Sequence, residues 1–447
     1  MARVFGTSSQ SSRRLPADTR IAIIGAGSSG VMAACSLVDK GYRRITLFEA
    51  SDRIGGKVET VQIDGQWIEL GAVMALRSNK SLYRMARGGL TRPMPHNFWV
   101  AEAPGDGRSW LPSEKYWKRS RFEVAAGVLA FNRLLWRPDF RCIFQPGFYD
   151  LHRDLLSLTM AEFATAHGFA AIMEPFQVAL YVKGYGPMTS VPALYPLKLM
   201  PYFEKAILMR RLSLGLHPGV WMFERYQKFW EDAVAERVAR GLRLRPGCKV
   251  TSVGREAAPG RPARIAIAAD GKNEAFDFLI VATPPNQTLE YLDVSQEERS
   301  LFGRVQYFDY CSVLFRASGV DENACVSLRY NMTEGRQGRL FCLLGWKPGS
   351  GLFTGYQSFQ RGASSEELDR QLAQDIVDIG GSLETVVLRR TWSYFPHVGL
   401  EDLSAGYYER LNSLQGKSGT YFIGALFCFE TSEHCAQFAE FLVGCHF

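Results

Sequence analysis

The residues at positions 25–30, with the sequence GAGSSG, have types and spacing that suit the binding of a phosphate group. Gly25 permits a tight turn, Gly27 lets the backbone approach a pyrophosphate, and Gly30 allows a helix to pack closely on a strand. A helix is predicted to begin here, and its free N–H groups, Ser29 among them, favour an anion. The run therefore predicts a turn that binds a dinucleotide.

An acidic residue follows this turn at a suggestive distance. Glu49 comes after Gly30 at the interval of about 20 residues typical of such sites, at the end of the next predicted strand. A carboxylate there can accept hydrogen bonds from ribose hydroxyls and disfavours a 2′-phosphate. Alone, a glutamate at a strand end would be a solvated surface residue, but after this glycine run it predicts ribose binding.

Two further segments, RIGGK at residues 53–57 and ELGA at residues 69–72, continue the pattern. The first supplies two cations and two glycines, which suit a backbone that passes close to a pyrophosphate. With these four motifs in order, the chain resembles the superfamily of FAD-dependent amine oxidases and phytoene desaturases. The resemblance implies FAD as the cofactor, with contacts to its pyrophosphate and flavin at Arg53, Gly56, Lys57, Gly71 and Ala72.

Later segments fit the same superfamily. The resemblance places Val250 on the adenine side of FAD and makes the strand that ends at Ala282 a second fingerprint. Near the last strand the superfamily usually has Gly-Asp or Gly-Thr-Glu, whereas this chain has the sequence GAL from position 424. We therefore expect the final flavin contacts from the backbone at Gly424 and from the helix start near Thr431.

The flavin chemistry is predicted from segments further along the chain. Amine oxidases of the superfamily carry a lysine near flavin N5, but the matching stretch, DYCSVLF at residues 309–315, has none. Nearly end to end, the chain is similar to the bacterial polyenoic fatty acid double-bond isomerases and their relatives. Three strings carry this similarity: GYG at 184–186 with VPALY at 191–195, TWSYFPHV at 391–398, and AGYYE at 405–409.

The similarity to the isomerases implies a redox-neutral reaction, in which FAD takes a hydride from an allylic carbon and returns it elsewhere on the same molecule. Such a reaction needs an apolar channel that excludes water. Aromatic residues of this type are more often found packing in a core than facing a substrate. The candidates for the channel wall are Tyr185, Trp392, Tyr394 and Phe395.

The polar end of the substrate also needs an anchor. The isomerases of this subgroup use an arginine, and the matching position here is His96. A free carboxylate held elsewhere, an acyl chain on a carrier, an ester or another polyene therefore all stay open. An exposed surface charge is the simpler interpretation of each alternative anchor. These alternatives are Arg92, Lys198, Arg210 and Arg211.

The sequence thus predicts an FAD-dependent oxidoreductase that moves a hydride through flavin N5 on an unsaturated aliphatic substrate, such as a polyene, a fatty acid or an acyl chain. A redox-neutral double-bond isomerase is the preferred hypothesis. Two alternatives stay open. One is an FAD-dependent oxidase or desaturase that acts on an amine or a polyene, and the other is a flavin-binding scaffold without catalysis.

A parallel sheet must hold these motifs at one edge. Residues 21–25, 31–38 and 45–48 have the pattern of a strand, a helix and a strand, which is the βαβ unit that opens a doubly wound sheet. A capping box at Thr159 and Glu162 marks a helix in the region that follows.

Further strands are predicted at residues 242–253, 263–269 and 276–282. We predict an α/β fold, in which a Rossmann-type doubly wound FAD-binding domain is interleaved with a substrate domain of mixed sheet and helices. The FAD-binding domain is assigned residues 20–80, 241–295 and 418–447, the substrate domain residues 81–240 and 296–417, and a disordered leader residues 1–19.

The composition is that of a globular protein, with 47% hydrophobic and 22% charged residues. No run reaches the roughly 18 apolar residues that a membrane span needs. The nine cysteines are scattered without the spacing of a metal site or a disulfide scaffold. The first 20 residues lack the apolar segment of a secretory signal. These features predict a reduced, cytoplasmic protein without a metal.

Basic residues are concentrated in one segment. Residues 114–141 hold seven Lys and Arg side chains against three acidic ones, within a chain of net charge +7. A basic, aromatic-rich surface could contact an anionic membrane or an acyl carrier, although a solvated charged face is commoner. No module that reads nucleic acid is recognisable. The expected partner is a small apolar substrate, with a carrier or membrane contact left open.

Overall fold

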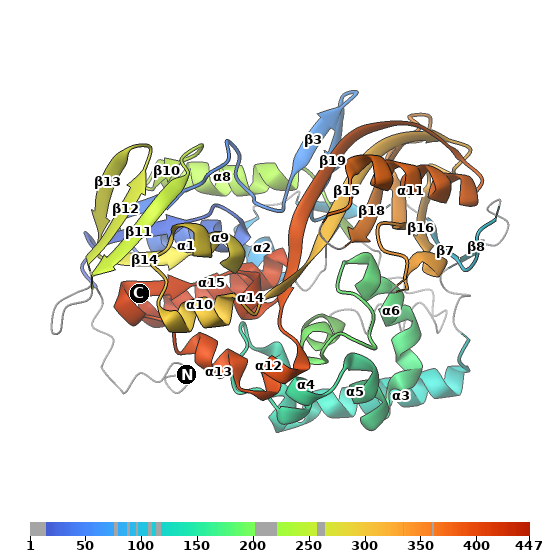
Figure 1. Cartoon of the computed structure of the whole chain (residues 1–447), viewed down its shortest axis with the longest axis horizontal. Coiled ribbons are helices and arrows are strands. Elements are labelled where there is room, and N and C mark those ends of the chain that lie inside the picture. Colours follow the sequence, from blue (N-terminus) through green and yellow to red (C-terminus); the bar gives the residue numbers. More distant parts are fainter. Residues whose placement is uncertain are drawn as a thin grey trace.

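The computed structural model describes residues 15–75, 79–86, 90–94, 97–105, 110–112, 118–201, 221–256, 264–333, 335–359 and 362–447. A parallel sheet with its helices forms one half of the molecule, and a large mixed sheet with further helices forms the other (Figure 1). The long strands β15 (Gln306–Ser318) and β19 (Ser382–His397) run from the middle of the molecule into the second half.

The parallel sheet has the strand order β10-β2-β1-β14-β20, and all neighbouring strands run parallel. Its central strands are short apolar runs that are almost wholly buried, as expected when both faces of a sheet are covered. The predicted α/β fold with a doubly wound nucleotide-binding sheet is therefore confirmed. The strands are β1 (Arg20–Ile24), β2 (Arg44–Phe48), β10 (Arg243–Arg245), β14 (Phe278–Val281) and β20 (Thr420–Phe422).

Helix α1 (Ser28–Asp39) packs against α15 (Ser432–His446) and α8 (Tyr226–Val238). The helix α8 belongs to the segment that the sequence assigned to the substrate domain. Its contact with α1 places it beside the nucleotide-binding sheet instead, because Trp230 and Val234 bury their apolar side chains in the same core as the first βαβ unit. The division into two domains otherwise stays a prediction.

A three-stranded antiparallel sheet, β11-β12-β13, stands next to the parallel sheet. The sequence predicted one strand over residues 242–253, but the structure has two strands there, β10 and β11, in different sheets. The reason is the turn between them, where Gly247 has a φ of +66° that a strand cannot contain. The strands are β11 (Val250–Glu256), β12 (Arg264–Ala269) and β13 (Lys272–Phe276).

The mixed sheet of the second half has the order β19-β15-β18-β17-β16-β7-β8. Its neighbours are antiparallel except for β16 and β7, which run parallel. Helix α11 (Ser365–Asp378) covers one face with Leu368, Leu372 and Ile376, which recur at intervals of four residues. The remaining strands are β7 (Asn97–Ala101), β8 (Trp110–Pro112), β16 (Ala324–Leu328), β17 (Leu340–Gly345) and β18 (Leu352–Phe359).

Helices fill the space below the mixed sheet in Figure 1. The predicted capping box is confirmed, since Thr159 and Glu162 exchange their side-chain and backbone hydrogen bonds at the start of α5. No helix among the described residues combines the length and the apolarity that a membrane crossing requires. The helices here are α3 (Arg121–Trp136), η1 (Pro138–Phe144), α4 (Arg153–Ser157), α5 (Met160–Ala166), η2 (Ala170–Ile172) and α6 (Met173–Val182).

Short elements complete the chain. A hairpin of β3 and β4 follows the first βαβ unit, and a small sheet has the order β5-β9-β6. The bounds are β3 (Thr60–Ile63), β4 (Gln66–Glu69), β5 (Met74–Ala75), α2 (Lys80–Met85), β6 (Thr91–Pro93), β9 (Trp221–Phe223), α9 (Pro285–Tyr291), α10 (Gln296–Phe302), η3 (Arg329–Asn331), α12 (Leu400–Ser404), α13 (Tyr407–Asn412), η4 (Lys417–Gly419) and α14 (Ala425–Cys428).

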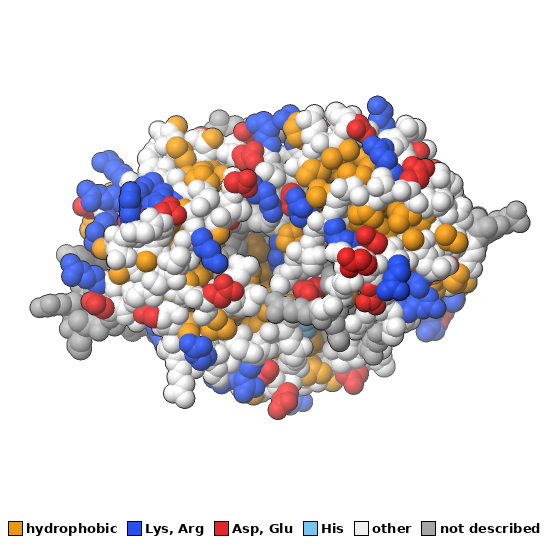
Figure 2. All heavy atoms as spheres, turned by 45° about the horizontal axis from the view of Figure 1, so that its top comes forward, with side chains coloured by type: hydrophobic (Ala, Val, Ile, Leu, Met, Phe, Trp, Pro, Cys, Tyr) orange, Lys and Arg blue, Asp and Glu red, His pale blue; other side chains and the backbone are white. Residues whose placement is uncertain are grey.

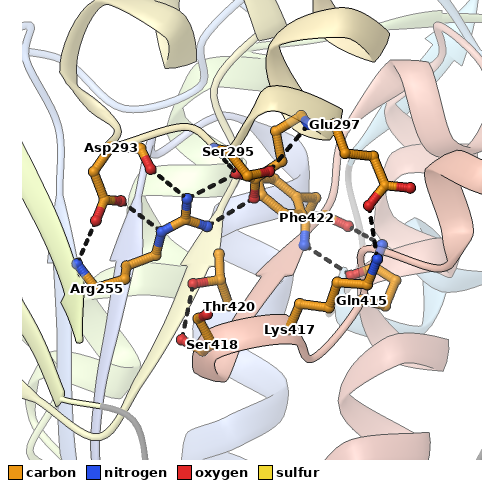
Figure 3. Close-up of polar contacts among 10 residues, drawn as sticks. Arg255, Asp293, Ser295, Glu297, Gln415, Lys417, Ser418, Thr420 and Phe422 are labelled. Atoms are coloured by element: carbon orange, nitrogen blue, oxygen red, sulfur yellow. Dashed lines mark hydrogen bonds and ion pairs between the residues drawn. The ribbon is translucent and has the colours of Figure 1, made fainter. Parts of the chain in front are cut away.

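A buried ion pair connects the antiparallel sheet to α10 (Figure 3). The two Nη atoms of Arg255 donate to the two carboxylate oxygens of Glu298 at 2.7 and 2.8 Å, and its Nε donates to Asp293 at 2.6 Å. The side chains of Arg255 and Glu298 are only 7% and 4% exposed. Arg255 holds the pKa of Glu298 below its usual value despite burial, so the pair is charged at neutral pH.

We expect Arg255→Met to lower the free energy of unfolding by about 3–5 kcal/mol, because it leaves the buried charge of Glu298 uncompensated. Urea unfolding followed by circular dichroism measures this loss. Adding Glu298→Gln, which removes that charge, should restore part of the stability. A double variant as unstable as Arg255→Met would contradict the electrostatic explanation.

Candidate functional site

The first glycine turn joins β1 to α1. Gly25 has a φ of +101°, in the region that favours glycine. A Cβ on Gly30 would lie 1.9 Å from the carbonyl oxygen of Gly25, so this glycine lets the helix rest on the turn. A Cβ on Gly27 would instead make only an ordinary van der Waals contact, with the Cα of Gly56 at 3.9 Å. Gly27 thus keeps clear the space at the N-terminus of α1 that a pyrophosphate needs.

Glu49 follows β2, and three hydrogen bonds hold its carboxylate. Oε2 accepts from the backbone N–H of Ala26 at 2.8 Å, while Oε1 accepts from the backbone N–H and the hydroxyl of Ser51 at 2.9 and 2.8 Å. A carboxylate offers about four acceptor positions, so one remains for a ribose hydroxyl. The carboxylate is therefore fixed beside the glycine turn, with one acceptor position left for the predicted contact with ribose.

The RIGGK segment lies directly against the glycine turn. The N–H of Gly55 donates to the carbonyl oxygen of Ala26 at 3.0 Å. The Nη1 of Arg53 donates to the carbonyl oxygen of Val58 at 3.0 Å, and its Nη2 lies 3.4 Å from the carboxylate of Glu59. The glycine backbones of the two segments are therefore in contact, and a cofactor could pass alongside both of them.

Lys57 connects this segment to the C-terminal part of the chain. Its Nζ lies 2.9 Å from a carboxylate oxygen of Glu430 and 5.0 Å from the ring centre of Tyr394. A Cβ on Gly71 would lie 1.8 Å from the carbonyl oxygen of Lys57, so the ELGA segment needs its glycine to rest on the RIGGK segment. The cofactor motifs that are separate in the sequence are thus in contact.

The C-terminal contacts come from the residues between β20 and α15. Gly424 has a φ of +116° at the end of β20. The hydroxyl of Thr431 caps α15 by accepting from the N–H of His434 at 3.1 Å. Residues 431–435 line the same cavity as the glycine turn. The N-terminus of a 15-residue helix therefore lies at this cavity, where its amides and dipole favour electron-rich groups.

One cavity of about 850 Å³ extends from the glycine turn to a group of aromatic side chains. Figure 2 shows the molecule hollowed between its two halves, with hydrophobic side chains in the hollow. Gly30 is absent from the lining because it packs behind the turn. The predicted cofactor residues that line the cavity are Gly25, Gly27, Ser29, Glu49, Arg53, Gly56, Lys57, Gly71, Ala72, Val250, Ala282, Gly424 and Thr431.

Three predicted channel residues, Tyr185, Trp392 and Tyr394, line the aromatic end of the cavity, together with Tyr310 of β15. The hydroxyl of Tyr185 donates to the carbonyl oxygen of Glu430 at 2.8 Å, and Tyr185 stacks on Tyr394 with ring centres 6.0 Å apart. Burial raises the pKa of Tyr185, Tyr310 and Tyr394 above its ordinary value. They are therefore neutral hydrogen-bond donors rather than bases.

Phe395 does not line the cavity, which corrects the expectation for this residue. It follows Tyr394 in β19, where successive side chains point to opposite faces, and its ring is buried in the core. There it packs edge-on against Tyr185 with ring centres 5.0 Å apart. Its backbone N–H donates to the carboxylate of Glu430 at 3.0 Å. Phe395 therefore supports the wall from behind.

The candidate anchors are placed as follows. Lys198 is buried outside the cavity and donates to the carbonyl oxygens of residues 142, 145 and 147 at 3.1, 2.9 and 2.8 Å, so its role is structural. Arg92 lies 4.0 Å from the carboxylate of Glu224 and does not line the cavity either. His96, Arg210 and Arg211 lie outside the described residues.

Two residues that the sequence did not single out belong to the site. Glu430 contacts Lys57, Phe395 and Tyr185, as described above. Lys183 follows α6 and lines the cavity, with its Nζ 3.4 Å from the sulfur of Met74, and burial lowers its pKa to about 8. The signal in the sequence that could have identified Lys183 is its position directly before the GYG string at 184–186. Neither residue could be assigned without knowing which distant segments meet.

We expect Gly27→Val to yield a folded, colourless protein, because the added side chain enters the space for the pyrophosphate without a clash inside the protein. The dissociation constant for FAD should rise by about a hundredfold or more, or roughly 3 kcal/mol. Titration with FAD followed by flavin fluorescence measures the change. Gly254→Val is the matched control, since a Cβ there meets nothing within 4 Å. Normal FAD affinity of Gly27→Val would contradict the assignment.

Comparison with known proteins identifies the cofactor class. Residues 28–135 match the family described as flavin containing amine oxidoreductase. The chain is 24% identical to the FAD-dependent oxidoreductase dpasF of Apiospora sacchari, over 92% of this chain and 89% of that protein. It is 22% identical to the FAD-dependent oxidoreductase dpchF of Colletotrichum higginsianum, over the same shares of the two chains.

Solved structures share the fold. The CLA-producing fatty acid isomerase from P. acnes superposes with a TM-score of 0.84 at 24% identity, over 97% of this chain and all of that chain. Putrescine oxidase bound to putrescine superposes with a TM-score of 0.64 at 14% identity, over 96% and 98%. The motifs, the cavity and these matches agree on one conclusion: the cofactor of the chain is FAD.

Proposed function

We propose that the protein is a redox-neutral double-bond isomerase that acts on an unsaturated aliphatic substrate. The observation that carries this proposal is the aromatic end of the cavity. Tyr185 and Tyr310 donate their hydroxyl protons to backbone carbonyl oxygens and present ring surfaces to the cavity. Such a wall offers apolar contacts and little apparatus for acid-base catalysis, which suits a hydride transfer from hydrocarbon.

When bound, FAD supplies a planar acceptor that takes a hydride and can return it. The residues of the chain hold the substrate and exclude water. Trp392 and Tyr310 are opposite each other in the pairing of β19 and β15, so their positions are fixed by a continuous sheet. Lys57 forms an ion pair with Glu430 and lies over the ring of Tyr394, and all three residues line the cavity.

The similarity in fold to a fatty acid isomerase supports this proposal, as does the composition of β15. In this strand Tyr307 and Tyr310, rather than a lysine, line the cavity. The rival function, a net oxidase or desaturase, is favoured by one observation. Lys183, which follows α6, brings a lysine to the cavity from an element other than β15. Amine oxidases of the superfamily carry a lysine near flavin N5, so this lysine favours the rival function.

Lys183 is also the residue that we assign to the polar end of the substrate. Its amine is buried in the cavity wall and its pKa is about 8, so it is mostly protonated at neutral pH. A cation there can pair with a carboxylate, which is the headgroup of a free fatty acid. This assignment replaces the arginine that the related isomerases use.

Anaerobic mixing of the FAD-loaded protein with a polyunsaturated fatty acid tests the function. We expect conjugated-diene absorbance to grow while the absorbance of oxidised flavin returns to its starting value after each turnover. An oxidase or desaturase would leave the flavin bleached in the absence of oxygen. Either that outcome or the absence of any product would contradict the isomerase proposal.

The assignment of Lys183 predicts a pH dependence. The protonated fraction of a group with a pKa of about 8 falls about tenfold between about pH 7 and about pH 9. The KM for a fatty acid should therefore rise about tenfold over this range. Lys183→Met should remove the dependence, and a fatty acid methyl ester, which lacks the charge, should not show it. A KM that rises equally with pH in Lys183→Met would contradict the assignment.

A further inference from the structure

Helix α3 is apolar on both of its sides, although one side lies in solvent. Its inner side is buried against η1 and η2. Its outer side exposes Phe122, Leu129 and Trp136 to 88%, 68% and 81%, which makes them the three most exposed large apolar side chains of the described residues. An apolar helix is normally covered all round. The outer side of α3 therefore has the composition of a contact surface.

These three side chains form one stripe. They recur every seven residues, or about two helical turns, so they point in the same direction along a helix about 24 Å long. The other exposed apolar side chains of the described residues are scattered over other elements, as with Val377 on α11 and Val387 on β19. Single exposed apolar residues need no explanation, whereas a continuous stripe does.

Positive charge surrounds the stripe. Residues 118–144 contain six Lys and Arg side chains against two acidic ones. Arg119 and Arg137 pair with neighbouring acids. Arg121, Arg133 and Arg141 are exposed and form no ion pair within the part of the chain that the structure describes. Their charge is therefore available to an anionic partner.

We propose that α3 docks on the surface of an anionic membrane. Phe122, Leu129 and Trp136 enter the boundary between headgroups and acyl chains, and the arginines around them contact lipid phosphates. A basic helix with aromatic and aliphatic residues on its outer face has the features of a helix that lies in the plane of a membrane interface.

The charges argue against a second copy as the occupant of this surface. In a two-fold symmetric contact along α3, the six basic side chains of residues 118–144 of one chain would meet the same six of the other, with only two acidic side chains on each to offset them. An acidic carrier protein would neutralise the arginines but must also bring an apolar stripe of matching length. A lipid surface supplies both the negative charge and the apolar phase.

The position of α3 relates this surface to the site. α3 packs against η2, and α6 follows η2 directly in the chain. Val182 at the end of α6 and Lys183 after it line the cavity. The proposed membrane helix is thus connected to the cavity wall through η2 and the length of α6. This arrangement suits an enzyme whose apolar substrate dissolves in a bilayer, although the docking does not depend on the proposed reaction.

Flotation of the FAD-loaded protein with vesicles tests the proposal. One set consists of phosphatidylcholine, and the other contains equal parts of phosphatidylcholine and phosphatidylglycerol. We expect binding to the second set only. The triple variant Phe122→Ser, Leu129→Ser, Trp136→Ser should bind at least about tenfold more weakly, because its apolar side chains no longer enter the lipid. The double variant Arg121→Glu, Arg133→Glu should lose binding to a similar extent.

Two matched controls carry equivalent changes elsewhere and should bind like the wild type. Val377→Ser with Val387→Ser alters exposed apolar residues, and Arg299→Glu with Arg410→Glu reverses exposed charges on α10 and α13. Bound FAD, seen by its absorbance, verifies that each variant is folded. Brominated lipid should quench wild-type tryptophan fluorescence more than that of Trp136→Phe, which keeps an aromatic side chain at this position.

Three outcomes would overturn the proposal. The first is no binding to the anionic vesicles. The second is binding to the anionic vesicles that the triple variant retains, because charge alone would then account for the contact with lipid. The third is a wild-type dimer in solution that the triple variant dissociates, which would assign the surface to a second copy of the chain.

Discussion

The close approach of two stretches of backbone, the glycine turn after β1 and the RIGGK segment, is the constraint on which the rest of the site depends. The N–H of Gly55 donates to Ala26, and Gly27 and Gly56 face each other without side chains. A Cβ on Gly56 would lie 3.0 Å from the Cα of Gly27, so the close approach requires a glycine there. The strands, the helix dipole and the carboxylate of Glu49 all position groups around this contact, which is why the cofactor could be identified before the substrate.

The parts of the site that the sequence predicted are those encoded by neighbouring residues. The turn at Gly25, the acid at Glu49 and the RIGGK segment each follow from short-range patterns, and the structure places them at one cavity. The capping box at Thr159 was equally local. By contrast, the break between β10 and β11 depends on Gly247, whose positive φ is one of several conformations open to a glycine.

The substrate end shows where local patterns fail. Phe395 and Tyr394 are adjacent in an aromatic string, yet Tyr394 lines the cavity while Phe395 packs behind it. Successive side chains of a strand point to opposite faces, but which face meets the cavity is set by contacts distant in the sequence, such as that of the Phe395 N–H with a carboxylate 35 residues away. Lys183 was overlooked for a similar reason, since an isolated lysine can be assigned to the site only when Met74 of β5 and Cys342 of β17 are seen beside it at the cavity.

Glu430 connects the cofactor end of the cavity to its aromatic end. Its side chain binds Lys57 of the cofactor segment and the backbone of Phe395 on the substrate side, while its carbonyl oxygen accepts from Tyr185. One residue thus joins the groups that meet the dinucleotide to those that shape the aromatic wall. The groups that meet the cofactor and those that shape the aromatic wall therefore share one residue, so a change at Glu430 would remove contacts on both sides of the cavity at once.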